Sequence, residues 1–513
     1  MTDSSSNLAA SALRGVRWNY LGGIGASVCS LAIGIVLARI LGPRPFGQVI
    51  IATMIYGFVN LFVDGGFSQA LIQRPELTEE EIRKTFTCQV AIGLGTTAIV
   101  WLAAPWIAAR FHDPTAMHVI QAMAFIITTQ STGLVSAALL RRSMRFKAVQ
   151  YASLGSYLAG FLVVGIPLAL LGAGVWSLVA AYLVQSTVNS LLLHRAARHT
   201  LKPLFALPDR SIVNFGGTII ANNVVNWGHS NIDNIAASGL GPVALGLYGR
   251  GCNFAYQPVT TVANGLQSVL LSSAARAQDR QQVMRALTLA VVGIIFGVLG
   301  AAYVTFALIP GTTITGLYGD KWVGVIPLMV PMALAMPFYG VHALLGPIVC
   351  GLGRPELEFW PQAISCGFAA VAYFSAAHVS LACIAWALLA VMLLRFAAIA
   401  FFAFRLLRIS WIEALRIIVL RAAFSVAFAG LVWVADQGLR LLHLGAASRL
   451  AVLAALCAAM LAWCVVRLPR VVFGGQAVEF LLQYAAHLPA WYVRRLRVST
   501  GAKTAQTMAA AQL

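Results

Sequence analysis

Polar side chains recur at helical spacing inside apolar stretches of this sequence. Between residues 211 and 237, Asn222, Asn226, His229 and Asp233 follow one another at steps of three or four residues, so they share one face of a helix. Amide groups on such a face can hydrogen-bond a polar solute, and an acid such as Asp233 can hold a proton or a sodium ion. The spacing therefore predicts a wet face that binds a solute.

Two further apolar stretches repeat this pattern. Their polar residues include Asn253, Gln257 and Asn264 within 243–273, and Tyr56, Asn60, Asp64 and Ser68 within 46–72. Polar groups inside a bilayer are costly unless they face protein or a water-filled cavity. We therefore predict a hydrophilic cavity, with Asp64 and Asp233 as candidate ion-coupling residues. Hydrogen bonds that hold packed helices together are the structural alternative.

The composition requires that these stretches cross a membrane. Hydrophobic residues make up 60% of the 513 residues, charged residues make up 10%, and the mean hydropathy is +0.82. Soluble domains have about 45–50% and about 25% of these classes. A chain this apolar cannot cover its own surface in water, which excludes a soluble enzyme and a secreted disulfide scaffold. The eight cysteines lie in apolar runs without a CxxC pair, so we expect neither disulfides nor a metal site.

The apolar runs predict an all-α polytopic membrane protein. Runs long enough to span a bilayer number about fourteen. This even number places both termini on one side, and most of the 35 Lys and Arg residues then fall on that same side. Since basic loops stay in the cytosol, both termini are predicted to be cytosolic. The net charge of +19 therefore indicates membrane topology, not a nucleic-acid partner.

An internal repeat predicts the domain organisation. The heptad Leu41–Gly47 reads LGPRPFG, and Leu240–Gly246, six spans later, reads LGPVALG. An even offset gives both halves the same orientation, which predicts two six-helix lobes related by a pseudo-two-fold axis along the membrane normal. The predicted parts are a cytosolic N-terminus (1–15), an N-lobe (16–200), a C-lobe (201–410), two extra C-terminal helices (411–466), and a cytosolic tail (467–513). The tail is expected to carry an amphipathic helix that lies on the inner leaflet or docks on the bundle.

The isolated cations allow two interpretations. Arg39, Arg250 and Lys321 fall in the outer third of the predicted bilayer or at its outer mouth. Arg39 and Arg250 are either topological anchors or anion-binding groups. Arg395 and Arg421 lie closer to the cytosolic ends of their spans and are predicted to snorkel. Phosphate-loop and HExxH motifs are missing, so we expect neither an enzyme nor a cofactor.

Several short motifs belong together. They are Leu37–Pro43 with Phe46-Gly47, Asp64–Arg74, Leu77–Glu80, Leu140–Lys147, Gly174–Leu178, Asn231–Asn234 and Tyr318–Trp322. As a set they resemble the motifs of Wzx-type polysaccharide flippases, in the branch of colanic-acid-type exporters within the multidrug/oligosaccharidyl-lipid/polysaccharide superfamily. The resemblance covers about residues 12–405. The pair Arg44-Pro45 departs from the family's acidic or small residues there.

The resemblance implies a carrier in the bacterial inner membrane. Such a carrier flips undecaprenyl-diphosphate-linked oligosaccharide units to the periplasmic leaflet by alternating access, for exopolysaccharide or lipopolysaccharide synthesis. Its expected partners are the lipid-linked oligosaccharide, membrane lipids, a polysaccharide polymerase and a chain-length regulator. An ion gradient is a possible source of energy, because the chain has no nucleotide site.

This family assignment gives each candidate residue a role. Arg39 and Arg250 are predicted to engage the diphosphate, because guanidinium groups bind phosphate in a bidentate manner. The other predicted substrate-binding residues are Asn60, Asn222, Asn226, Asn253, Gln257, Asn264 and Lys321. Two alternatives stay open: a drug/cation antiporter of the same superfamily, for which an acidic cavity is expected, and a membrane polysaccharide polymerase or glycosyltransferase, for which a large outer loop is expected.

Overall fold

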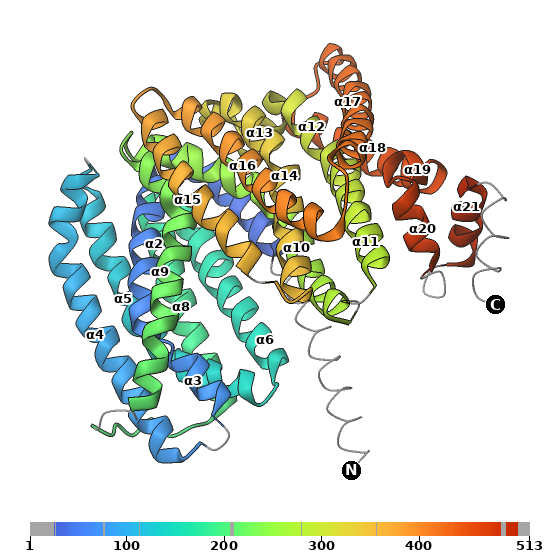
Figure 1. The fold of residues 1–513 in the computed structure, drawn as a ribbon. Coiled ribbons are helices and arrows are strands. Elements are labelled where there is room, and N and C mark those ends of the chain that lie inside the picture. Colours follow the sequence, from blue (N-terminus) through green and yellow to red (C-terminus); the bar gives the residue numbers. More distant parts are fainter. Residues whose placement is uncertain are drawn as a thin grey trace. The chain divides into compact units, whose positions relative to one another are not determined.

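The computed structural model describes residues 25–500, apart from positions 26, 75–76, 112, 206–209, 277, 279, 355 and 484–488. Every regular element within this range is a helix. The chain forms two compact units, Met1–Arg250 and Gly251–Leu513 (Figure 1). The predicted N-terminus at 1–15 lies outside the described residues, and the predicted lobe boundaries stay a prediction.

The first unit is a bundle in which α5 packs against α4 and α8, while α9 lies beside α2 and α3. Its helices after Ser27–Leu41 are α2 (Pro43–Asp64), α3 (Phe67–Gln73), α4 (Glu79–Arg110), α5 (Ala116–Arg142), α6 (Phe146–Tyr157), the π-helix η1 (Leu158–Gly165), α7 (Ile166–Leu170), α8 (Val175–Ala197), α9 (Arg210–Ser238) and the start of α10 (Pro242–Arg276). The segment Phe146–Leu170 is continuous, so α6, η1 and α7 form one span.

The second unit has its core around α14, which packs against α12 and α16. After α10 come α11 (Gln281–Ile294), the π-helix η2 (Ile295–Leu299), α12 (Gly300–Leu308), α13 (Pro310–Tyr318), the 3-10 helix η3 (Asp320–Val325), α14 (Ile326–Gly351), α15 (Glu356–Ala377), α16 (Leu381–Leu407), α17 (Trp411–Leu441), α18 (Ala446–Arg467), α19 (Pro469–Val472), α20 (Gly475–Gln483) and α21 (Ala490–Thr500).

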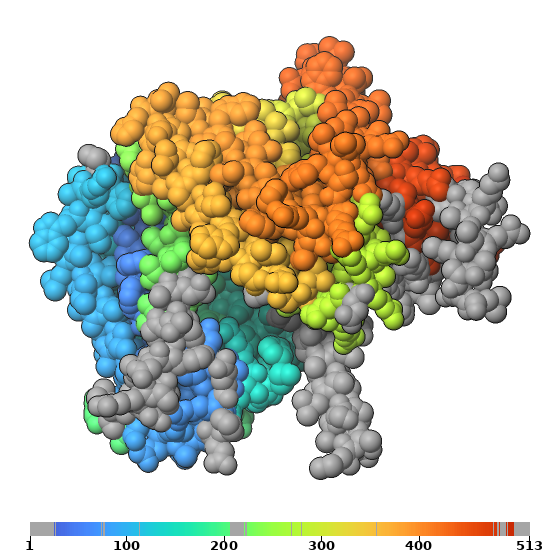
Figure 2. All heavy atoms as spheres, in the orientation of Figure 1, coloured from blue at the N-terminus to red at the C-terminus, as the bar shows by residue number. Residues whose placement is uncertain are grey.

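The helices confirm an all-α membrane protein. Ten helical segments of the described chain are long and apolar enough to cross a bilayer. The four remaining predicted runs also fall on helices, namely Ser27–Leu41, α9, α10 and α15. The face of the second unit in Figure 2 includes α15, which exposes Phe359, Trp360, Ile364, Phe368, Val371 and Phe374. A stripe this apolar suits lipid better than water.

One predicted span is interrupted. The sequence predicts a single run over 46–72, whereas the structure ends α2 at Asp64 and begins α3 at Phe67. Gly65 and Gly66 both adopt positive φ angles, 52° and 72°. Two successive residues in the left-handed region cannot continue a right-handed helix, and glycine tolerates this conformation because it has no Cβ. The prediction of one uninterrupted run is therefore wrong at this point.

The two copies of the repeated heptad pack against each other. A Cβ atom added to Gly47 would lie 1.7 Å from the carbonyl oxygen of Pro242, and one added to Gly246 would lie 2.0 Å from the carbonyl oxygen of Pro43. Neither position has room for a side chain. The contact is reciprocal, so the first turns of α2 and α10 approach each other through equivalent residues. A contact in which corresponding residues of the two heptads exchange places is what a local two-fold axis between them would produce.

The C-terminal segment docks on the second unit. A Cβ atom on Gly297 would lie 1.9 Å from the carbonyl oxygen of Val472, and α20 packs along α11. The Arg421 guanidinium, which is 7% exposed, donates to the carbonyl oxygen of Arg470 at 3.0 Å. The predicted snorkelling of Arg421 is therefore wrong, because its side chain is buried and its guanidinium bonds to a backbone carbonyl of the C-terminal segment. The position of this segment relative to the membrane stays a prediction.

A buried acid joins α13, which lies within the predicted C-lobe, to the two helices α17 and α18 that follow that lobe. Asp436 of α17 is fully buried and accepts a hydrogen bond from Thr312 of α13 at 2.9 Å. Its ion pairs are with Arg440 at 2.9 Å and with Arg449 of α18 at 3.9 Å. Removing one partner would leave a buried charge uncompensated, so this cluster fixes α13, α17 and α18 together.

A second buried acid closes the turn between α4 and α5. Asp113, which is 2% exposed, accepts hydrogen bonds from Gln48 at 2.7 Å and from Thr115 at 2.6 Å, and lies 3.4 Å from the Arg44 guanidinium. Burial is the largest single influence and would raise the pKa of this carboxyl. The hydrogen bonds from Thr115 and Gln48, together with the charge of Arg44, outweigh burial and lower the pKa below its usual range. Arg44, which departs from the resembled motif, thus pairs with an acid of its own chain.

The lowered pKa predicts a pH-dependent stability effect for Asp113→Asn. The ionised form is favoured by folding, so its stabilisation is complete above the unfolded pKa of about 3.9 and is lost as the pH falls through the lower folded pKa. We expect Asp113→Asn to cost about 1.5–3 kcal/mol at pH 7.

Thermal unfolding of the purified protein in detergent, measured at pH 7 and at pH 3, checks this expectation. The difference from the unsubstituted chain should shrink at the lower pH. Asp320→Asn, at an exposed acid on η3, serves as the matched control and should change little at either pH. An equal loss for Asp113→Asn at both values would contradict the assignment.

Candidate functional site

A polar cavity of about 510 Å³ lies within the first unit, between α2, α3, α5 and α9. Its polar lining consists of Asn60, Asp64, Ser68, Gln69, Arg141, Asn223, Asn226, Ser230 and Asn231, and its other lining residues are Leu61, Ile72, Leu134 and Trp227. The structure therefore brings together three of the predicted site residues, Asn60, Asp64 and Asn226, from two different stripes. Such a cavity can hydrogen-bond a hydroxyl-rich solute.

The break between α2 and α3 shapes one end of this cavity. Asp64 is the last residue of α2, and its carboxylate accepts a hydrogen bond from the Ser68 hydroxyl of α3. Arg141, near the end of α5, also lines the cavity. The cavity thus contains an acid and a base, and the described residues form no ion pair between these two side chains.

Trp227 holds α9 beside α2. Its ring lies 4.9 Å from the ring of Phe58, and a Cβ atom on Gly57 would lie 3.2 Å from its indole nitrogen. Gly57 therefore leaves space in which the indole fits. The Asn231 amide donates to the carbonyl oxygen of Trp227 at 2.9 Å. The contacts of Trp227 with Phe58 and Gly57 place this face of α9 against α2.

Arg250 lies near the repeated heptads, as the sequence suggests. Its guanidinium is 5.1 Å from the centroid of the Phe46 ring, a cation–π distance. A Cβ atom on Gly34 would lie 2.7 Å from its Nη2 atom, so the helix Ser27–Leu41 passes close to this group. Arg39 is on that same helix and is exposed. Neither arginine lines the cavity of the first unit, and their binding of phosphate stays a prediction.

The second predicted acid has a different setting. Asp233 accepts hydrogen bonds from the Tyr248 hydroxyl at 3.1 Å and from the backbone NH of Asn234 at 2.8 Å. It does not line the cavity that contains Asp64. The two candidate ion-coupling acids therefore do not share a site, and Asp64 is the one beside other solute-binding groups.

The other predicted residues whose side chains are described do not line this cavity. Asn253, Gln257 and Asn264 lie on α10, where the first and the last are exposed and Gln257 is half-buried. Lys321 is exposed on η3. The side chain of Asn222 lies outside the described residues. For all five, substrate binding stays a prediction.

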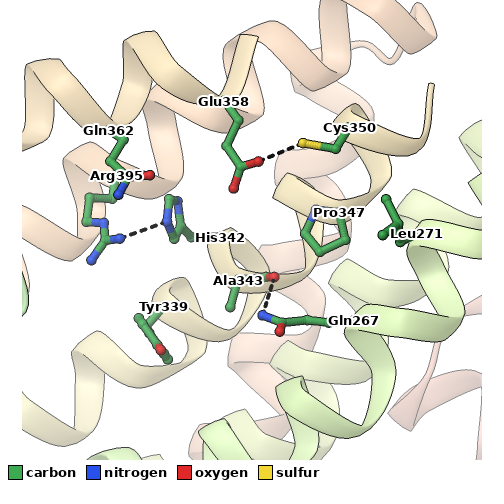
Figure 3. Close-up of a pocket in the computed structure, with 10 residues that line it drawn as sticks. All are labelled: Gln267, Leu271, Tyr339, His342, Ala343, Pro347, Cys350, Glu358, Gln362 and Arg395. Carbon is green, nitrogen blue, oxygen red and sulfur yellow. Dashed lines mark hydrogen bonds between the residues drawn. The ribbon is translucent and has the colours of Figure 1, made fainter. Parts of the chain in front are cut away.

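A second cavity, of about 470 Å³, lies within the second unit between α10, α14, α15 and α16 (Figure 3). Arg395 of α16 donates from Nη2 to Nε2 of His342 at 3.0 Å. Across the cavity, the Cys350 thiol donates to Oε2 of Glu358 at 2.8 Å. The predicted snorkelling of Arg395 is wrong, because the guanidinium turns toward a histidine on the neighbouring helix. These polar residues come from three helices, with His342 and Cys350 on α14, Glu358 on α15 and Arg395 on α16, and the sequence interpretation groups them into no stripe.

In the described part of the chain, no group of three or more His, Cys, Asp and Glu side chains is arranged to hold an ion. Arg141 is the clearest cavity residue that helical periodicity does not indicate, because it lies among the basic residues of Leu140–Lys147 at the end of an apolar run. Its place in the motif Leu140-Arg141-Arg142 is the only sequence signal that could have indicated it.

Comparison with known proteins gives consistent matches. The model of the family described as polysaccharide biosynthesis protein matches residues 36–327, more than half of the chain. The lipopolysaccharide biosynthesis protein WzxC of Escherichia coli K12 is 24% identical over 364 residues, which cover 68% of this chain and 71% of WzxC. The succinoglycan biosynthesis transport protein ExoT of Rhizobium meliloti is 25% identical over 350 residues, which cover 68% of this chain and 70% of ExoT.

Solved structures share the fold. The lipid II flippase MurJ in an inward closed conformation superposes with a TM-score of 0.69 at 11% identity, covering 87% of this chain and 98% of that one. An inward-facing multidrug resistance MATE transporter superposes with a TM-score of 0.56 at 15% identity, covering 75% and 95%. At such low identity these likenesses establish the fold alone.

The polar cavity of the first unit predicts water access inside an apolar bundle. We expect a cysteine introduced as Asn226→Cys to react several-fold faster with a membrane-impermeant maleimide than one introduced as Val225→Cys. Thiols react as thiolates, which form only where water stabilises the charge. Val225 is the adjacent residue on α9, lies outside the cavity lining and is 59% exposed.

The labelling rate in native membranes is the measurement, and the unsubstituted chain with its eight cysteines gives the background. Equal rates at the two positions, or faster labelling at position 225, would contradict a hydrated cavity.

Proposed function

This chain belongs to the polysaccharide biosynthesis protein family, as a Wzx-type flippase of the multidrug/oligosaccharidyl-lipid/polysaccharide superfamily, and we propose that it flips undecaprenyl-diphosphate-linked oligosaccharide units from the cytosolic to the periplasmic leaflet. The destination of these units is exopolysaccharide or lipopolysaccharide. The relatives named above are biosynthesis and transport proteins, which supports this direction of work.

The single observation that carries the proposal is the polar cavity of the first unit. Amide and hydroxyl groups from α2, α3 and α9 converge there inside an apolar bundle. Sugars need many donors and acceptors in a site from which bulk lipid is excluded, and a buried amide without a partner is costly. A cavity of this kind is explained by a hydrated, hydroxyl-rich cargo.

We propose alternating access as the mechanism. Fourteen spans would form two six-helix lobes, over 16–200 and 201–410, with 411–466 as two extra helices and both termini in the cytosol. The lobes would rock so that the cargo headgroup meets water first on the cytosolic side and then on the periplasmic side. The reciprocal packing of the repeated heptads supports such symmetry. A polymerase and a chain-length regulator would then receive the flipped units.

A drug/cation antiporter is a weaker explanation. A cavity selective for cations should carry excess negative charge, whereas the lining of the cavity in the first unit includes both Asp64 and Arg141. The amide groups around these two side chains can hydrogen-bond sugar hydroxyls whatever the net charge of the cavity. The chemistry of the cavity therefore favours a glycan.

Arg39 and Arg250 are proposed to hold the diphosphate. Each is a cation near one copy of the repeated heptad, and Arg250 is already positioned by Phe46 and Gly34. We expect Arg39→Ala and Arg250→Ala each to lower surface polysaccharide several-fold, and the double substitution to lower it to the level of the empty vector. A lost guanidinium removes charge-assisted hydrogen bonds to phosphate.

Surface polysaccharide is measured in cells that lack their own copy of the gene, with the amount of membrane protein determined in parallel. Arg110→Ala, at an exposed arginine on the same predicted side of the membrane, is the matched control. Normal polymer in both single variants and in the double variant would exclude this role.

Asp64 and Asp233 are proposed to carry the coupling ion. In proteoliposomes, a proton or sodium gradient should accelerate movement of the lipid-linked oligosaccharide. Asn in place of Asp cannot exchange a proton and holds a cation poorly. We expect Asp64→Asn to abolish the acceleration, because its carboxylate lies in the polar cavity, and Asp233→Asn to weaken it. Gradient-driven movement that persists when both acids are replaced would rule the idea out.

A further inference from the structure

The cavity of the second unit has the chemistry of a sugar-acid site. We propose that it binds one acidic sugar, a pyranose that bears a carboxylate, of the transported oligosaccharide. This inference rests on the proposed function, because it names the class of cargo. It assigns a role to Arg395, His342, Gln362, Gln267 and Glu358, none of which belongs to the predicted site.

Arg395 supplies a positive charge without a negative partner. Ion pairs within the described chain do not include it, and its Nε atom, although buried, makes no hydrogen bond to any described residue. It lies near the middle of α16 (Leu381–Leu407), where an ion is costly to hold. A buried guanidinium with unused donors is stabilised when a carboxylate accepts from it in a bidentate manner.

The bond to His342 fixes the charge of the imidazole. A guanidinium can only donate, so Nε2 of His342 must accept and carries no proton. The imidazole is therefore neutral in this arrangement and orients the guanidinium without adding a second positive charge. This end of the cavity offers one positive charge, enough for a single carboxylate.

The rest of the cavity lining offers acceptors and amides. Glu358 comes from α15, and Gly346 makes space for it, since a Cβ atom there would lie 2.5 Å from Oε1. A carboxylate accepts from the adjacent hydroxyls of a sugar ring, while Gln267 and Gln362 can both donate and accept. Tyr339 adds a ring surface and a hydroxyl (Figure 3).

The balance of charge selects the ligand. One arginine against one glutamate leaves no excess positive charge, so a diphosphate would be repelled by Glu358 while one arginine neutralised only part of it. A monoanion with many hydroxyls satisfies both ends at once. The volume of about 470 Å³ lies within the range of ordinary small-ligand sites, about 300–1,000 Å³. The glycerol phosphate headgroup of phosphatidylglycerol is the other monoanion with hydroxyls, and the test separates the two.

The test compares two synthetic lipid-diphosphate disaccharides that differ only in their terminal sugar, glucuronic acid or glucose. Binding to the full chain is measured in phosphatidylcholine nanodiscs. The unsubstituted chain should prefer the acidic probe about ten-fold, and Arg395→Leu should remove this preference because it weakens binding of the acidic probe far more than binding of the neutral one. Arg405→Leu, at an exposed position on the same helix, should keep the preference.

A second variant preserves the shape of the cavity if Arg395→Leu does not fold. Glu358→Gln removes the repelling charge and should increase the preference for the acidic probe several-fold. Equal binding of both probes by the unsubstituted chain, or a preference that survives Arg395→Leu, would overturn the inference and leave the proposed function intact.

Two further outcomes are distinct. Failure of both lipid-linked probes to bind would contradict the proposed function itself. Nanodiscs that contain phosphatidylglycerol form the third arm. In this arm, phosphatidylglycerol competes with the acidic probe. If phosphatidylglycerol displaces that probe, its binding depends on Arg395, and the chain binds the two disaccharide probes equally, then the cavity holds a lipid headgroup and the sugar assignment is wrong.

Discussion

Inside a bilayer, a polar side chain must find a partner in the protein or water in a cavity, and this constraint sorts the polar residues of the chain. One group is engaged within the protein: Asp436 with Thr312 and two arginines, and Nη2 of Arg421 with a backbone carbonyl. These residues hold helices together. The other group lines cavities, where amides and charges face space. Only the second group is available for a cargo, although the residue types are the same in both.

Glycine makes the first of these cavities possible. Gly57 admits the indole of Trp227, and Gly65 with Gly66 ends α2 so that Ser68 turns back to Asp64. At the heptads, Gly47 and Gly246 let two helix starts meet backbone to backbone. At Gly47, Gly57 and Gly246 the missing Cβ allows a close contact, and at Gly65 and Gly66 it allows a left-handed backbone conformation. The site therefore depends on small residues that carry no chemistry of their own.

The sequence predicts the helices and the polar faces well because both follow from periodicity. Asn60, Asp64 and Asn226 meet in one cavity as their stripes suggest, since residues three or four apart share a helical face. Periodicity contains no information about single polar residues on separate helices. Arg395 and His342 meet only because their helices pack together, so the sequence does not indicate their contact. Arg141 lies next to a loop, where a basic residue indicates membrane topology and not a cavity. The break at Gly65 depends on backbone conformation, which hydropathy does not report.

Each cavity is lined by one acid and one arginine that, within the described chain, do not form an ion pair with each other, Asp64 and Arg141 in the first and Glu358 and Arg395 in the second. A carrier must hold its cargo tightly enough to bind and loosely enough to release, and it must also return empty. A strongly cationic cavity would fail on both counts, because it would retain an anionic headgroup and would be costly to desolvate when empty. Near balance of charge lowers that cost and leaves recognition to hydrogen bonds, which a hydrated glycan can exchange with water at either side.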